Sequence, residues 1–196
     1  MMKLSTIGSL LVACGLVMMV GCNKKQPEPV TQIPQQSPEA VAAHDVNSVA
    51  GVHWTRPERW GVQPPRQMRI ATYSVPAAEG DGEGGECAVF HFGSGQGGDI
   101  VSNIDRWVSQ FENGKPQQTS KEFNGLKVTL VQIAGTYLAP SGPMMQSSGK
   151  KENYRLLGAI VGAPEGSVFF KLTGPAKTIA ACESDFNRLL GSLGKQ

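Results

Sequence analysis

The pattern of hydrophobic and polar positions divides the chain into three parts. Residues 4–20 contain no charged side chain, residues 23–48 are rich in proline and glutamine, and later residues mix apolar and polar positions in short runs. These compositions predict an export segment, a disordered tether and a globular domain. We therefore expect three regions with boundaries at 1–21, 22–50 and 51–196.

The third region carries both strand and helix periodicities. A helix is predicted over 99–111, with Asp99 as its cap, and a second helix is predicted after Pro175. The buried stripe of the second helix is Ile179, Cys182, Phe186, Leu189, Leu190 and Leu193. Strands are predicted over 67–75, 87–92, 126–137, 154–161 and 167–173, with a short one ending near Phe123.

The order of these elements predicts an α+β fold. Asn124-Gly125 is a strong hairpin signal, Ala163 to Gly166 fits a type I turn, and the polar segment 139–150 is typical of a long loop. A parallel sheet would need a helix between most strands. We expect an antiparallel sheet of about five to seven strands packed with two main helices. The strand over 87–92 is apolar on both sides, which indicates a central position.

The closing stretch GSVFFKLTGPAKTIAACESDFNRLLGSL (166–193) combines a strand, a Gly-Pro break and a helix. Together with the order of elements, it resembles the PsbP-like fold, named for an extrinsic subunit of photosystem II. Several exported bacterial lipoproteins have this fold. Its members act mostly as binding or accessory subunits, so the resemblance implies a protein that is not an enzyme.

The start of the chain has the organisation of an export signal. Lys3 precedes the apolar run, and Met19-Val20-Gly21-Cys22 looks like a bacterial lipobox, in which Met19 replaces the usual Leu. The resemblance implies cleavage between Gly21 and Cys22 and lipid attachment to Cys22. A retained transmembrane anchor and simple secretion are the alternatives. Asn23 instead of Asp implies the periplasmic face of the outer membrane, if the organism is Gram-negative.

Charge and motifs limit the function further. The formal net charge is +2 with acids and bases interspersed, which disfavours nucleic-acid binding. No metal site or cofactor is predicted, and no catalytic residues form a known motif. Two weaker alternatives are an anion site at the glycine-rich 93–98 and a cation site at the acidic 79–86. Cys87 and Cys182 are either a disulfide or two buried thiols.

These features favour a non-catalytic accessory or binding module in the cell envelope. The expected partners are the membrane, through the lipid anchor, and an envelope protein or small ligand. The alternative is an envelope hydrolase or other enzyme with a groove near His53, His91 and the loop 139–150. His91 would then need a carboxylate or hydroxyl group within about 3.2 Å at a cleft.

The anchor gives the first testable prediction. Cys22→Ser should abolish labelling by radioactive palmitate and leave an unprocessed precursor in the membrane, because lipid attachment precedes cleavage at this type of signal. Cys14→Ser is the matched control and should be labelled as the parent chain is. Labelling that persists in Cys22→Ser contradicts the assignment.

Overall fold

The computed structural model describes residues 45–141 and 146–196, with side chains from 45–139 and 149–196. The predicted signal, Cys22 and most of the tether lie outside the described residues. No helix among the described residues is long and apolar enough to cross a membrane.

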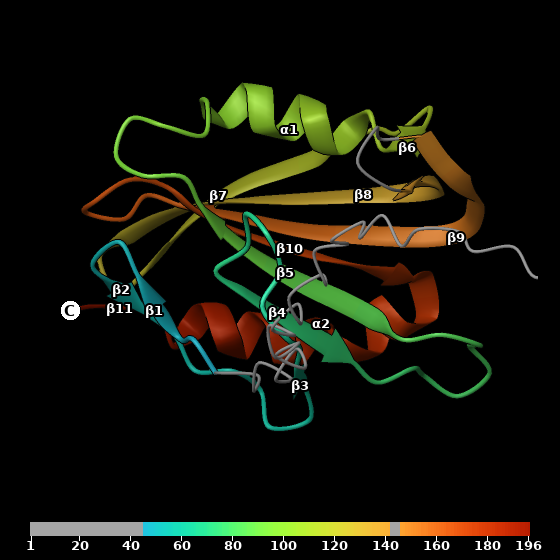
Figure 1. The fold of residues 1–196 in the computed structure, drawn as a ribbon, viewed down its shortest axis with the longest axis horizontal. Helices are drawn as coiled ribbons and strands as arrows, with labels where there is room; N and C mark the ends of the chain where they lie inside the picture. Colours follow the sequence, from blue (N-terminus) through green and yellow to red (C-terminus); the bar gives the residue numbers. More distant parts are fainter. Residues whose placement is uncertain (1–44, 142–145) are drawn as a thin grey trace, which may run out of the picture. The chain divides into compact units, whose positions relative to one another are not determined.

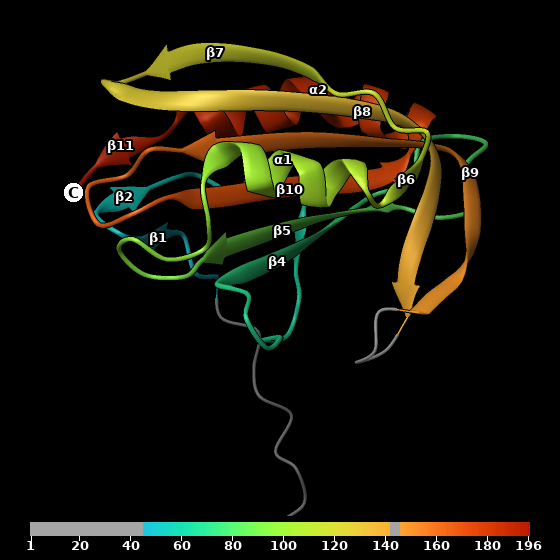
Figure 2. The ribbon, with the colours of Figure 1, turned by 90° about the horizontal axis from the view of Figure 1, so that it is seen from above.

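An antiparallel sheet forms the centre of the domain. It contains eight strands, in the order β3-β4-β5-β10-β9-β8-β6, with β7 also pairing with β8 (Figures 1 and 2). The strands are β3 (Gly61–Val62), β4 (Ala71–Val75), β5 (Gly85–His91), β6 (Phe111–Glu112), β7 (Gln117–Phe123), β8 (Leu126–Ser141), β9 (Gln146–Val161) and β10 (Val168–Pro175). The prediction of an α+β fold is confirmed, whereas the sheet is larger than the expected five to seven strands.

A smaller sheet closes one end of the domain. It joins β1 (Ser48–Val49), β2 (Val52–His53) and β11 (Gly194–Lys195) in the order β1-β2-β11. Residues 45–50, which we assigned to the tether, therefore contribute to the fold of the described part. Their contacts bring the start of the domain against its last residues.

The two helices lie on opposite faces of the large sheet. The helix α1 (Ile100–Val108) covers one face and α2 (Ala176–Gly191) the other (Figure 1). Side chains alternate between these faces along β10, where Phe170 packs with the α2 residues and Phe169 with the α1 residues. Both neighbours of β10 are hydrogen-bonded strands, so its apolar positions on either face are buried.

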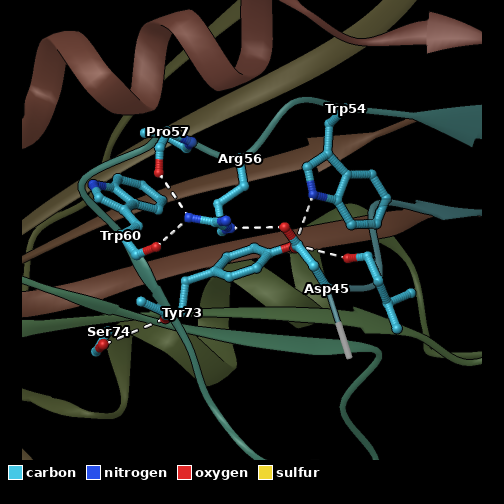
Figure 3. Close-up of polar contacts among 9 residues, drawn as sticks. Asp45, Trp54, Arg56, Pro57, Trp60, Tyr73 and Ser74 are labelled. Atoms are coloured by element: carbon cyan, nitrogen blue, oxygen red, sulfur yellow. Dashed lines mark hydrogen bonds and ion pairs between the residues drawn. The ribbon is translucent and has the colours of Figure 1, made fainter. Parts of the chain in front are cut away.

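The segment 45–62 completes the α2 face. Trp54 and Trp60 are each about 1% exposed, so both are core residues. Trp54 Nε1 donates to the hydroxyl group of Tyr73 at 3.0 Å (Figure 3), and this hydroxyl group donates to Val46 O at 2.7 Å. Burial raises the pKa of Tyr73 above its ordinary value, so this hydroxyl remains a donor.

Arg56 holds the same segment in place from its outer side. Its guanidinium group donates to the carbonyl oxygens of Pro57 and Trp60 and pairs with Asp45 at 2.9 Å (Figure 3). One side chain thus joins the first described residue to the turn before β3.

The α1 face depends on a close contact between an indole ring and a glycine. A Cβ atom at Gly158 would lie 2.2 Å from Cζ3 of Trp107, which is closer than any real contact. Trp107 therefore packs directly on the backbone of β9. The predicted cap is also confirmed, because Asp99 Oδ1 accepts from Ser102 N at 2.7 Å.

Two predicted boundaries differ from the structure. The predicted loop 139–150 is largely strand, because β8 continues to Ser141 and β9 begins at Gln146. The two strands pair there through irregular registers, including Pro140 with Ser147. The first helix ends at Val108, and Phe111 belongs to β6 instead.

Gly158→Ala tests the indole contact. We expect a loss of about 1–3 kcal/mol in the free energy of unfolding, because the added methyl group overpacks the interface. Urea denaturation measures it, with Gly162→Ala as the control, since a Cβ there meets its nearest atom at 3.6 Å. The loss should shrink in a Trp107→Leu background. Equal losses in both backgrounds would contradict the contact.

Candidate functional site

The α1 face of the sheet changes from apolar to polar along its strands. Near α1 this face of β5, β9 and β10 carries Phe90, Ile160 and Phe169, which pack in the α1-side core. One step further, Lys171 stands between Ala88 and Gly158, and the next cross-strand row is Glu86, Thr173 and Leu156. Both cross-strand neighbours of Lys171 are small, and the ring of Trp107 covers the backbone of Gly158.

A cleft of about 200 Å³ lies at this polar end. Its aromatic walls are Tyr137 and Tyr154, whose rings stack with centroids 5.6 Å apart and planes 2° from parallel. The cleft is lined by Glu83, Gly84, Gly85, Glu86, Tyr137, Lys151, Tyr154, Thr173 and Gly174. These residues come from the loop before β5 and the start of that strand, and from β8, β9 and β10.

Lys171 is a partly buried cation with neutral partners. Its ammonium group donates to Gln110 Oε1 and lies 5.6 Å from the centroid of the Tyr137 ring. Among the described residues, no carboxylate lies within ion-pair distance of it. Burial lowers the pKa of Lys171 from 10.5 to about 8, with repulsion from Arg69 adding to the effect and Glu86 opposing it.

The two carboxylates of the cleft are held by cations. Glu83 accepts from Lys151 (2.6 Å) and from the Tyr154 hydroxyl group, and these hydrogen bonds hold the pKa of Glu83 below its ordinary value. Glu86 pairs with Arg66 (2.9 Å) and Arg69 (2.7 Å). Neither carboxylate is therefore placed as a free general base.

The rest of the acidic segment 79–86 has a structural role. Asp81 Oδ2 accepts from the backbone N–H (2.8 Å) and hydroxyl group (2.7 Å) of Thr178 in the first turn of α2. The local N-cap, Pro175, makes no such side-chain bond, so Asp81 caps the helix from a distant loop. Among the described residues no group of three or more potential metal ligands is gathered, so nothing there supports the cation alternative.

The predicted catalytic groove does not assemble around His91. Its Nδ1 lies 3.1 Å from the carbonyl oxygen of Ser167, and no hydrogen bond joins it to a carboxylate or hydroxyl group in the described part. His53 is exposed in β2, on the small sheet. The tip of the predicted loop, 142–145, lies outside the described residues.

The glycine-rich segment 93–98 forms a tight connection into α1. Four of its glycines have positive φ, and Asn103 donates to Gly97 O at 2.8 Å. The carboxylate of Asp99 accepts at the first turn of the helix, where a bound anion would have to lie. The structure thus gives the anion alternative no support.

Cys87 and Cys182 are buried free thiols on the α2 face. Burial raises the pKa of both, to about 11 for Cys182, and the Cys182 thiol contributes to the shift of Cys87. The disulfide between them stays a prediction.

Two larger grooves differ from the cleft in their polar groups. One of about 690 Å³ is lined by three arginines, of which Arg56 pairs with Asp45 and Arg188 with Asp185. The other, of about 660 Å³, lies between Ile100 and the β7–β8 hairpin. Neither groove contains a buried polar atom without a partner, whereas the cleft is lined by Thr173, whose buried Oγ1 has none among the described residues.

Sequence reasoning missed the cleft. Lys171 occurs in a predicted strand, and a lysine there is usually a solvated residue at the edge of the apolar pattern. Only the register that places it beside Ala88 and Gly158 reveals its burial. The sequence did carry one signal of this burial: Lys171 is flanked by Phe and Leu on a strand that is apolar on both faces.

Comparison of the chain with protein-family models and with curated proteins returned no match.

The pKa of Lys171 predicts a pH dependence of stability. Between pH 8 and 10.5 the unfolded chain retains a proton that the folded chain has released, so folding becomes more favourable as the pH rises through this window. The stability of the parent chain relative to Lys171→Met should increase by at most about 1.4 kcal/mol for each pH unit. Urea denaturation of both proteins measures this difference in stability. The tyrosines titrate in the same pH range in both proteins, so their contribution cancels in the difference. A difference in stability that does not change with pH would contradict the burial of the ammonium group.

Proposed function

We propose that this protein is a lipid-anchored envelope lipoprotein whose domain is a non-catalytic binding module. The observation that carries the proposal is the cleft beside Lys171. It gathers hydrogen-bond donors on a rigid sheet, while its carboxylates are already held by cations. Such a site is suited to holding a ligand or a partner's polar group.

The reactive groups of the cleft support binding over catalysis. With a pKa of about 8, the Lys171 amine is mostly protonated at neutral pH and is a poor nucleophile. Burial raises the pKa of Tyr137 and Tyr154, which keeps both hydroxyl groups protonated. The hydrolase alternative lacks a carboxylate or hydroxyl partner for His91 in the described residues, where its Nδ1 lies next to the carbonyl oxygen of Ser167.

The proposed location rests on the sequence. Lipid on Cys22 and a proline-rich tether would present the domain beside the membrane, and two or more acyl chains give stable anchoring. The PsbP-like resemblance adds the expectation of an accessory subunit. An envelope protein is the proposed partner, with the cleft as its contact.

Site-specific photo-cross-linking in intact cells tests the function. A photoreactive amino acid at Gly82 fits, because a side chain there meets no atom within 4 Å and stands beside Glu83. Gly191 is the matched control, since it is equally open but lies at the end of α2. We expect a discrete cross-linked species at position 82 and no such species at position 191.

Two results would count against the binding module. One is the same pattern of cross-links at positions 82 and 191. The other is turnover of a model ester by the purified chain that His91→Ala abolishes, because this result favours the hydrolase.

A further inference from the structure

The polar groups around Glu86 carry more positive charge than the fold neutralises. Arg66 and Arg69 both bind its carboxylate, and Lys171 is close enough for Glu86 to act on its pKa. Three cations therefore surround one carboxylate on a sheltered part of the sheet. Arg69 and Glu86 are only 22% and 39% exposed at their side chains, so solvent screens this charge incompletely.

Two hydroxyl groups beside these cations have no partner in the described part of the chain. Thr173 Oγ1 is buried without a hydrogen bond, and Thr173 stands directly opposite Glu86 across the β5–β10 pair. Tyr137 is 9% exposed, and its ring contacts Phe111, Tyr154 and Lys171, but in the described residues no hydrogen bond joins its hydroxyl group to another residue. Both residues line the cleft.

Such a set of groups lacks an acceptor. Buried cations in proteins are normally paired, and an unpaired buried hydroxyl group costs free energy comparable to a lost hydrogen bond. The negative charge of Glu83 at the rim does not meet this need, because Lys151 and Tyr154 already bind it. A ligand with two or three acceptor oxygens would satisfy several donors together.

We infer that the cleft binds the oxyanion group, carboxylate or phosphate, of a small molecule. The hydroxyl groups of Tyr137 and Thr173, which line the cleft, would hold it together with two neighbouring cations, Lys171 beside the Tyr137 ring and Arg69 on Glu86. The volume of about 200 Å³ admits such a group with a short substituent. This inference deepens the proposed binding function by naming the chemistry of its ligand.

Titration of the mature full-length chain with inorganic phosphate, and separately with succinate, tests the inference. Backbone amide shifts are followed at constant ionic strength, with sodium chloride replacing the titrant, so that screening by salt stays unchanged. At least one anion should bind saturably, with a Kd of about 1 mM or below, and shift residues 86, 137, 171 and 173.

Lys171→Met should weaken this binding at least tenfold, and Arg69→Gln should also weaken it. Lys177→Met is the matched control, because Lys177 is an exposed lysine on α2, and it should bind as the parent chain does. Lys171→Met replaces a partly buried charge with an apolar side chain of similar length, so the variant should remain folded. Circular dichroism checks this. Equal binding by Lys171→Met, shifts confined to other residues, or no saturation by either anion would overturn the inference.

The two proposals fail separately. If the purified chain binds an anion but gives no cross-link at position 82, the oxyanion inference is supported and the envelope partner is contradicted. If the chain binds neither anion and the cross-link at position 82 is unchanged in Lys171→Met, the envelope partner is supported and the oxyanion inference is contradicted.

Discussion

The structure depends on how much of each sheet face a helix can cover. The eight residues of β10 extend about 26 Å, and the sixteen residues of α2 about 24 Å, so α2 spans nearly the whole length of β10, and the segment 45–62 covers more of the same face. The nine residues of α1 extend only about 14 Å. The other face therefore remains partly without a helix, and polar residues and two tyrosines occupy the uncovered part. The cleft follows from this difference in length.

Charge on a half-covered sheet is costly, and the domain reduces the cost through local pairing. Glu83 and Glu86 each bind two donors, and Asp81 caps α2. Lys171 differs from these groups because its partners are an amide and an aromatic ring. Neutral partners offset less of the desolvation of an ammonium group than a carboxylate does. This imbalance distinguishes the cleft from the groove of about 690 Å³, whose arginines are paired within the fold or exposed.

The α+β class, the central strands and both helices could be predicted from the sequence, because apolar periodicity reflects burial directly. The stripe from Ile179 to Leu193 is buried against the sheet, as its spacing predicts. The extension of β8 and β9 into 139–150 was missed, because this stretch is rich in Gly, Pro and Ser and has no alternation of apolar and polar residues. The cleft was missed for a different reason. Its residues come from four strands, and their proximity depends on register, which no local pattern specifies.

The state of the Lys171 ammonium group tests the account most directly. Its pKa can be measured by NMR titration of the Lys171 side chain in the full-length protein, with and without phosphate. The account predicts a pKa of about 8 in the free protein, since burial disfavours the charged form, and a pKa raised toward 10.5 when phosphate supplies the missing negative charge. A pKa near 10.5 that phosphate does not change would contradict both the burial of this cation and the role of the cleft.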